Sequence, residues 1–269
     1  MFKRIVMLSV LGCLGVLAAC APGGTDPAAQ YYPTYTAIAQ GLIDLENTAT
    51  AQAARPPETP TPPLPAGGTE NVKQSDGTTR YSDYDAGFEM TVPAGWIAVR
   101  PGAQEFNDAL SNDAANNQPL KDQMTLDQKG YVPVMDRLYF YATKPDVAQN
   151  DLLGYGKLTW SPSDSKPVDQ NSLGDLVQGL EMSKTMPGLR VVSSNIVMSG
   201  NNVPVIVIGA NWTPESSSGT ITPLYINMLF FKPTANSTVQ AVITSSKDHR
   251  DVIGPDVDAM VQSIKLLGK

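Results

Sequence analysis

The chain has 269 residues, 42% of them hydrophobic, and its 26 acidic and 19 basic side chains give a net charge of −7. This length and composition accommodate one large or two small domains with a buried core. The acidic balance excludes broad electrostatic docking to nucleic acid or to anionic lipid headgroups, which needs clustered lysine and arginine, but it is compatible with basic or metal-ion partners.

An export signal occupies the start of the chain. Lys3 and Arg4 precede an apolar run at positions 5–17, which has the length of a signal-peptide core and is too short for an ordinary membrane-spanning helix of about 20 residues. Leu-Ala-Ala-Cys follows and resembles the bacterial lipobox at every position. We therefore predict a signal peptide over residues 1–19, cut between Ala19 and Cys20. The alternative is an ordinary secretory signal followed by a chance cysteine.

The lipobox resemblance implies a covalent diacylglycerol and an N-acyl lipid on Cys20. Two or three acyl chains, at about 0.8 kcal/mol per buried methylene, form a durable anchor. We expect the protein on the cell membrane or the outer membrane, facing outside the cytoplasm. The only other cysteine, Cys13, lies within the apolar run. The processed chain therefore has no disulfide, zinc–thiolate site or iron–sulfur cluster, and we expect no cofactor besides the lipid.

Residues 20–77 are expected to form a lipidated, flexible, proline-rich tether. Within it, a short helix is predicted over residues 31–54, where apolar side chains recur at helical spacing at Tyr35, Ile38, Leu42 and Leu45. A frayed or partner-stabilised helix is favoured over a coiled coil, because the run covers barely two heptads. The proline-rich segment 55–65 excludes helix and central strand and, at about 3.1 Å per residue, spans about 34 Å as polyproline II. A PxxP-type ligand is the alternative for this segment.

A globular domain is expected over residues 78–269. Strands are predicted wherever apolar residues alternate or run together, at 81–85, 87–92, 132–142, 156–160, 189–198, 203–212, 224–232 and 239–245. Pro93 to Trp96 is interpreted as a turn that ends on a large apolar anchor, and Asn201-Asn202 as a hairpin turn.

Helices are predicted at three places in this domain. Residues 104–128 are polar and place Phe106 and Leu110 on one helical face. A second helix is capped by Asn171 or Ser172, and its apolar side chains follow one face at Leu173, Leu176, Val177 and Leu180. A last helix opens with Gly254-Pro255-Asp256.

The order of these elements predicts an α+β fold. Short links between the later strands imply antiparallel pairing. The segments 203–210 and 225–231 are apolar on both alternating faces, which is typical of strands covered on both sides. We therefore expect a mainly antiparallel β-sheet between helical layers.

Two stretches resemble one known group of proteins. GFEMTVPAGW at 87–96 resembles the opening hairpin of the PsbP-like families, and VQAVITSS with a helix ending VQSIKLL resembles their last strand and helix. The resemblance covers roughly residues 78–267 and implies an α/β/α arrangement around an antiparallel sheet. Members of these families are mostly non-catalytic: extrinsic photosystem subunits, a Ran-binding factor and many uncharacterised lipoproteins. No photosystem-specific or Ran-binding motif is present, so the resemblance assigns no residue a role.

The chain offers few groups for catalysis or metal binding. The only histidine, His249, lies between Asp248 and Asp251, and without a second histidine or cysteine a solvated turn is favoured over a metal site. No nucleophile elbow, dinucleotide-binding glycine motif or phosphate-binding loop is present. Acidic pairs are interpreted as solvated faces rather than as metal or glycosidase sites, namely Asp83 with Asp85 and Asp146 with Asp151.

Trp212 is the one residue predicted as a binding hot spot. It ends a strand beside the polar loop TPESSSGT, and exposed tryptophan is enriched at interfaces. Taken together, these features favour a non-catalytic binding or assembly module, anchored to a membrane, whose partner is an unknown envelope protein or other ligand and not nucleic acid. Two alternatives stay open: a carboxylate-based hydrolase, and a structural envelope component that self-associates through residues 31–54.

Overall fold

The structure, a computed structural model, describes residues 68–143, 152–214 and 223–268. The larger of its two sheets has seven strands, in the order β4 (Trp96–Val99), β5 (Asp136–Ala142), β6 (Gly154–Ser161), β10 (Ser237–Ser246), β9 (Leu224–Thr234), β8 (Pro204–Trp212) and β7 (Arg190–Met198). The smaller sheet has four, in the order β1 (Thr69–Lys73), β2 (Thr79–Asp83), β3 (Phe88–Val92) and β11 (Lys265–Leu266). Every neighbouring pair in both sheets is antiparallel.

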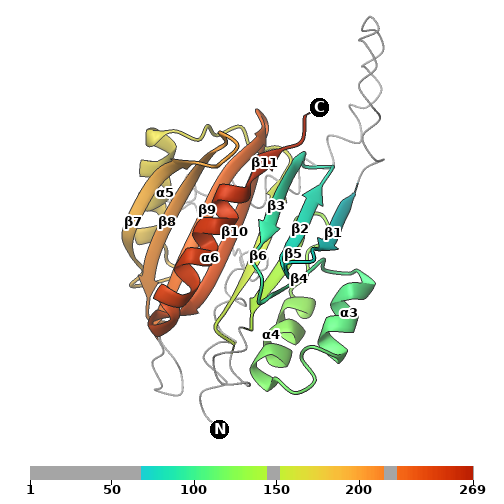
Figure 1. The fold of residues 1–269 in the computed structure, drawn as a ribbon. Coiled ribbons are helices and arrows are strands. Elements are labelled where there is room, and N and C mark those ends of the chain that lie inside the picture. Colours follow the sequence, from blue (N-terminus) through green and yellow to red (C-terminus); the bar gives the residue numbers. More distant parts are fainter. Residues whose placement is uncertain (1–67, 144–151, 215–222, 269) are drawn as a thin grey trace, which may run out of the picture.

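Four α-helices pack on the larger sheet within the described residues: α3 (Gln104–Ser111), α4 (Gln118–Lys129), α5 (Gln170–Glu181) and α6 (Arg250–Ser263). A short 3-10 helix, η4 (Lys247–His249), leads into α6. In Figure 1, α6 and the smaller sheet lie in front of the larger sheet, and α5 lies behind β7 and β8. The molecule therefore has three layers.

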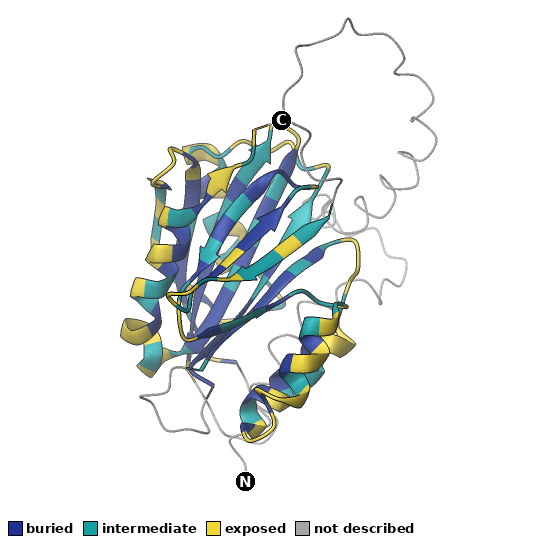
Figure 2. Ribbon diagram, turned by 45° about the vertical axis from the view of Figure 1, so that its right-hand side comes forward, coloured by how far each residue is buried: buried dark blue, intermediate teal, exposed yellow. Residues whose placement is uncertain are grey.

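Alternation of side chains along the strands divides the core between the two faces of the larger sheet. Phe140 of β5 faces the smaller sheet and α6, whereas its neighbours Tyr139 and Tyr141 face α3 and α4. Farther along the second face, Ile206 and Ile208 of β8 pack beneath α5. Figure 2 shows that buried residues concentrate on the strands, while the helices combine exposed positions with intermediate and buried ones.

The predicted fold class is confirmed. The structure is α+β, its sheets are antiparallel, and layers containing helices cover both faces of the larger sheet. One of these layers is only partly helical, because α6 shares it with the smaller sheet (Figure 1).

The folded part begins earlier than expected. Residues 69–73, assigned to the tether, form β1 and pair along their whole length with β2. The Asn71 side chain donates a 2.7 Å hydrogen bond to the Ala98 carbonyl, and Arg100 donates one to the Thr69 carbonyl. The mixed polar sequence TENVK gives little strand signal by itself, and its pairing and tertiary contacts hold it in place.

Several local boundaries also differ from the predictions. The segment 104–128 contains two helices, α3 and α4, and Trp96 begins the unpredicted strand β4. Helix α5 is capped by Asp169, whose carboxylate accepts a 2.8 Å hydrogen bond from the Ser172 backbone N–H, and not by Asn171 or Ser172. Helix α6 begins at Arg250 and contains Pro255 in its interior.

Several predictions lie outside the described residues: cleavage at Ala19, the lipid on Cys20, the helix over 31–54 and the proline-rich segment. The pair Asp146 with Asp151 also lies outside them. Among the residues that are described, no helix has the length and apolar character needed to cross a bilayer.

Candidate functional site

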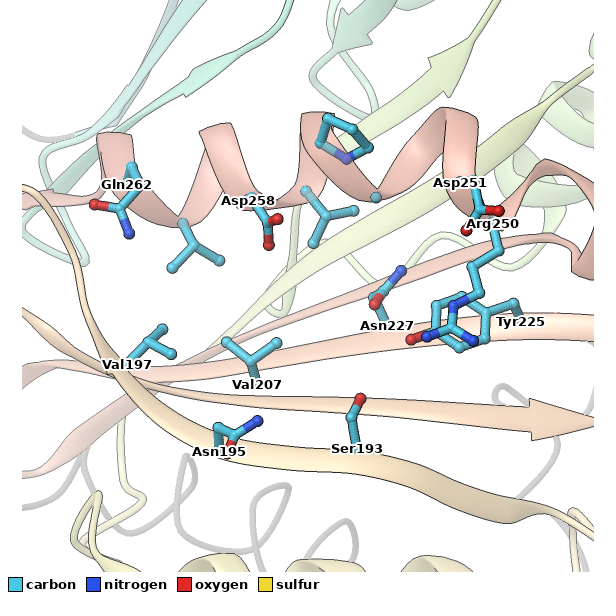
Figure 3. A pocket seen from close by; sticks show the side chains of 14 residues that line it. Ser193, Asn195, Val197, Val207, Tyr225, Asn227, Arg250, Asp251, Asp258 and Gln262 are labelled. Carbon is cyan, nitrogen blue, oxygen red and sulfur yellow. The ribbon is translucent and has the colours of Figure 1, made fainter.

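An open groove of about 700 Å³ separates α6 from the face of β7, β8 and β9, and we call it the α6 groove (Figure 3). Its floor comes from the strands and its wall from the helix. The lining residues are Ser193, Asn195, Val197, Val207, Tyr225, Asn227, Arg250, Asp251, Gly254, Pro255, Val257, Asp258, Val261 and Gln262. The groove exists because α6 crosses the sheet over its middle strands and leaves β7 and β8 uncovered (Figure 1).

A glycine shapes the floor. Gly209 of β8 lies between Ser193 of β7 and Asn227 of β9 in the strand register, so the three form a row across the sheet. A Cβ atom at Gly209 would lie 2.2 Å from the Tyr225 hydroxyl oxygen and 2.4 Å from the Ser193 Oγ. The missing side chain therefore lets two hydroxyl groups converge beside the Asn227 amide.

The Asn227 side chain has hydrogen-bonding capacity that the protein does not use. The residue is 8% exposed, and its amide lies at the floor of the groove, between the strands and α6 (Figure 3). It makes no hydrogen bond with any of the residues 68–143, 152–214 and 223–268. Neither polar atom of this amide is among the fully buried, unpartnered side-chain atoms of the described residues, so the amide oxygen and N–H groups face the open groove, where water reaches them. Asn227 thus offers a ligand one acceptor and two donors at the floor of the groove.

The helical wall adds charge. Arg250 lies with its guanidinium carbon 4.6 Å from the ring centroid of Tyr225, a cation–π contact that covers that ring. Asp251 follows it directly on α6. Asp258 lies two turns farther along the wall, facing the floor near Val207 (Figure 3), and forms no ion pair within the described parts of the chain. The groove therefore has neutral donors and acceptors below and an unpaired carboxylate on its wall.

Both carboxylates of the groove lie on its helical wall, and none lies on its floor. Asp251 and Asp258 are seven residues apart on one helix, about 10 Å along its axis. Paired carboxylates of glycosidases lie about 5–9.5 Å apart and face each other across the bond that they break. No cluster of three or more histidine, cysteine, aspartate or glutamate side chains that suits a metal ion occurs in the described residues.

Trp212, predicted as a binding hot spot, is a core residue. It is 4% exposed and belongs to the cluster beneath α5. Its indole N–H donates a 3.1 Å hydrogen bond to the Pro187 carbonyl. With its ring buried and its donor used, Trp212 offers no surface to a partner, and the prediction of direct recognition by this side chain is wrong.

Of the acidic pair interpreted as a solvated face, Asp85 is exposed and Asp83 is not. Asp83 is buried, accepts hydrogen bonds from the Tyr81 hydroxyl and the Ala86 backbone, and lies 3.6 Å from Arg137 Nε. Burial raises the pKa of its carboxyl group. Asp85 lies 3.7 Å from Arg137 Nη1. These contacts join β2 to β5 and are structural. His249 lies in η4, at the turn predicted between strand and helix.

A second buried carboxylate network connects α4 to β5. Asp127 accepts hydrogen bonds from the Tyr141 hydroxyl at 2.7 Å and from Gln123 Nε2 at 3.0 Å. Asp136 contacts Lys157 Nζ at 2.7 Å and accepts a 2.6 Å hydrogen bond from the Tyr139 hydroxyl. Both carboxylates are buried in the layer beneath α4. Such a network holds the helix on the sheet and leaves its carboxylates no open approach for a substrate.

Sequence reasoning missed the groove. Its residues come from four separate elements, and no short motif connects them. One signal was present: Asn227 is the single amide in the otherwise apolar strand LYINMLFF. A polar residue on the buried face of a central strand needs either an internal partner or a ligand.

Comparisons with known proteins give structural similarity without a family assignment. No protein-family model matches the chain, and no curated protein sequence matches it. The solved structures similar to it include cyanobacterial PsbP (CyanoP) from Synechocystis sp. PCC 6803, with 10% identity over 72% of this chain and 94% of that one and a TM-score of 0.42.

Two further structures belong to the same comparison. LpqN of Mycobacterium tuberculosis, described as involved in cell envelope biogenesis, is 11% identical over 75% of this chain and 91% of its own, with a TM-score of 0.42. The Ran-binding protein Mog1p of Saccharomyces cerevisiae is 10% identical over 75% of this chain and 97% of its own, with a TM-score of 0.41. The resemblance noted in the sequence thus extends to structural similarity with PsbP-like proteins at low identity.

Proposed function

We propose that this protein is a membrane-anchored extracytoplasmic lipoprotein whose folded part is a non-catalytic binding module, and that it binds its partner in the α6 groove. The lipobox at 17–20 supports the anchor. The observation that carries the binding role is the Asn227 amide, buried at the floor of an open groove without a partner in the described residues. A partner that hydrogen-bonds to this amide replaces the amide's contacts with water, for a net gain of about 0.5–1.5 kcal/mol per hydrogen bond.

The two alternative functions have less support. A hydrolase needs two carboxylates that meet across a substrate. The buried pair Asp127 and Asp136 lies inside the core, and the groove carboxylates are far apart along one helix. Self-association through residues 31–54 has support only from a run of barely two heptads.

Photo-crosslinking in intact cells tests the proposed function. A photoreactive amino acid replaces Asn195, which is exposed on the groove floor, and in a matched strain it replaces Asp175, which is exposed on α5 at the opposite face of the sheet. We expect a discrete adduct from position 195 and none from position 175. Adducts at 175 alone, or at neither position, would contradict a binding role for this groove.

A further inference from the structure

We propose that the α6 groove binds an extended peptide segment and places a basic side chain of that peptide against Asp258. This inference rests on the proposed function and specifies the class of partner. The peptide backbone would run along the groove beside β7 and cross the row formed by Ser193, Gly209 and Asn227.

The dimensions of the groove suit an extended chain. Ser193, Asn195 and Val197 point into it from alternate positions of β7, so they repeat about every 6.8 Å, the side-chain repeat of an extended peptide. The wall from Arg250 to Gln262 covers twelve helical steps, about 18 Å. Four or five extended residues at about 3.4 Å each fill that length.

The floor offers the chemistry that peptide groups require. A peptide unit presents one N–H donor and one carbonyl acceptor, and an asparagine side chain presents both kinds of group. Asn227 and Asn195 supply two such side chains, and the Ser193 and Tyr225 hydroxyls both donate and accept. The space over Gly209 is filled by the Tyr225 and Ser193 hydroxyl groups, so the absence of a Cβ atom places these two groups, and not the peptide itself, close to the sheet.

The charged side chains of the groove indicate which side chain the bound peptide carries. Arg250 is held against the Tyr225 ring, so Asp251 has a cation beside it in the sequence. Asp258 has no such counterpart, so the middle of the groove carries an unpaired negative charge. Val197 and Val207 lie on the floor opposite it (Figure 3). A lysine or arginine side chain matches both features, since its aliphatic stem packs on valine and its charged head reaches the carboxylate.

A set of labelled probes tests the proposal with the full-length protein in detergent micelles. Three fluorescent blocked pentapeptides of alanine carry lysine, norleucine or glutamate at the centre, and the fourth probe is tetra-N-acetylglucosamine. Binding is followed by fluorescence anisotropy for wild type, Asp258→Asn, Asn227→Leu and the control Asp175→Asn. Asp258 is exposed on the helix, so its substitution preserves the fold, and circular dichroism verifies this for each variant.

The expected pattern is specific. The lysine peptide binds wild type at least about fivefold more tightly than the norleucine peptide, and Asp258→Asn removes that preference. Asn227→Leu weakens both peptides by a similar factor, because it removes contacts to the backbone, and Asp175→Asn changes neither.

Other results would overturn the peptide class. Equal affinity for the lysine and norleucine peptides, no binding of any peptide at millimolar concentration, or binding of the oligosaccharide in place of the peptides would each do so. The proposed function is decided separately by the crosslink at position 195, which does not depend on the chemistry of the partner.

Discussion

The hydroxyl group of Tyr141 donates a 2.7 Å hydrogen bond to Oδ2 of Asp127, and both side chains are buried where α4 packs on β5. Burial is the main cause that raises the pKa of Asp127 to about 7, and it outweighs the lowering effects of the Tyr141 and Gln123 hydrogen bonds. At about pH 5 the folded protein therefore keeps a proton on Asp127 that the unfolded chain has lost.

This proton makes stability depend on pH. Because the pKa is higher in the folded state, the contribution of Asp127 to stability is full below about pH 4 and is lost as the pH rises through about 7. The loss amounts to at most about 4 kcal/mol, on the scale of 1.36 kcal/mol per pKa unit. In Asp127→Asn the side chain stays neutral, and its amide oxygen still accepts from one of the two donors while its NH2 group cannot accept from the other, so we expect a lower overall stability but a much shallower pH dependence.

Urea unfolding at a series of pH values between about 4 and 8 checks this prediction. Asp175→Asn, on the exposed face of α5, serves as the control and should retain the wild-type slope. Burial also raises the pKa of Asp83. Asp83 therefore adds to the loss of stability with rising pH, and it does so equally in both variants. An Asp127→Asn protein with the wild-type slope would contradict the assignment of the proton to Asp127.

Two glycines should respond oppositely to alanine. A Cβ atom at Gly156 of β6 would lie 2.0 Å from the buried ring of Phe140, so Gly156→Ala should lower the free energy of unfolding by about 1–3 kcal/mol or more. At Gly174 of α5 no atom lies within 4 Å, so Gly174→Ala should raise it by about 0.5–1 kcal/mol through helix propensity. Thermal unfolding of the two variants measures both effects, and a stable Gly156→Ala protein would show that Phe140 can repack.

Removal of β1 should destabilise the domain. A chain that starts at residue 78 lacks the strand pairing with β2, the Asn71 hydrogen bond to Ala98 and the Arg100 hydrogen bond to Thr69, all of which a chain that starts at residue 68 retains. We expect a lower melting temperature for the shorter chain, since it also exposes β2 as an unpaired edge. Equal melting temperatures would mean that β1 adds nothing to stability.

The lipid anchor is tested at Cys20. In cells that express the protein, Cys20→Ala should remove acylation and shift the protein from the membrane fraction to the soluble fraction, because two or three acyl chains supply the attachment. Mass spectrometry of the purified wild-type protein should find an N-terminal cysteine that carries lipid. Cys13→Ala, within the predicted signal peptide, is the control and should leave fractionation unchanged; an unmodified wild-type Cys20 would refute the anchor.

The sequence was most informative where hydrophobic patterns are long. The strands β7 to β10 and the helix α5 were predicted almost to their ends, because continuous apolar runs and helical spacing extend over nine or more residues. The hairpin at Asn201-Asn202 is confirmed, and Asn202 has the left-handed φ of 60° that favours asparagine in such turns.

Local sequence signals gave wrong predictions where tertiary contacts determine the boundary of a helix or the burial of a side chain. Pro255 was interpreted as the start of a helix, where proline is favoured, yet η4 and the first residues of α6 precede it. Trp212 was predicted at a surface from its polar neighbours, although packing beneath α5 buries it. The groove was unpredictable for the same reason: the position of α6 over the sheet, and not any short motif, brings Asn227 and Asp258 to one cavity.

The last strand of the domain completes a sheet begun near its start. In β11, Lys265 and Leu266 pair with Glu89 and Phe88, and the Leu267 backbone N–H donates a 2.9 Å hydrogen bond to the Gly87 carbonyl. Most strand pairs in the described residues join consecutive strands, so this pairing and that of β6 with β10 are the two that close long loops and cost the most chain entropy. The nascent polypeptide thus completes neither sheet until β10 and β11 have been synthesised.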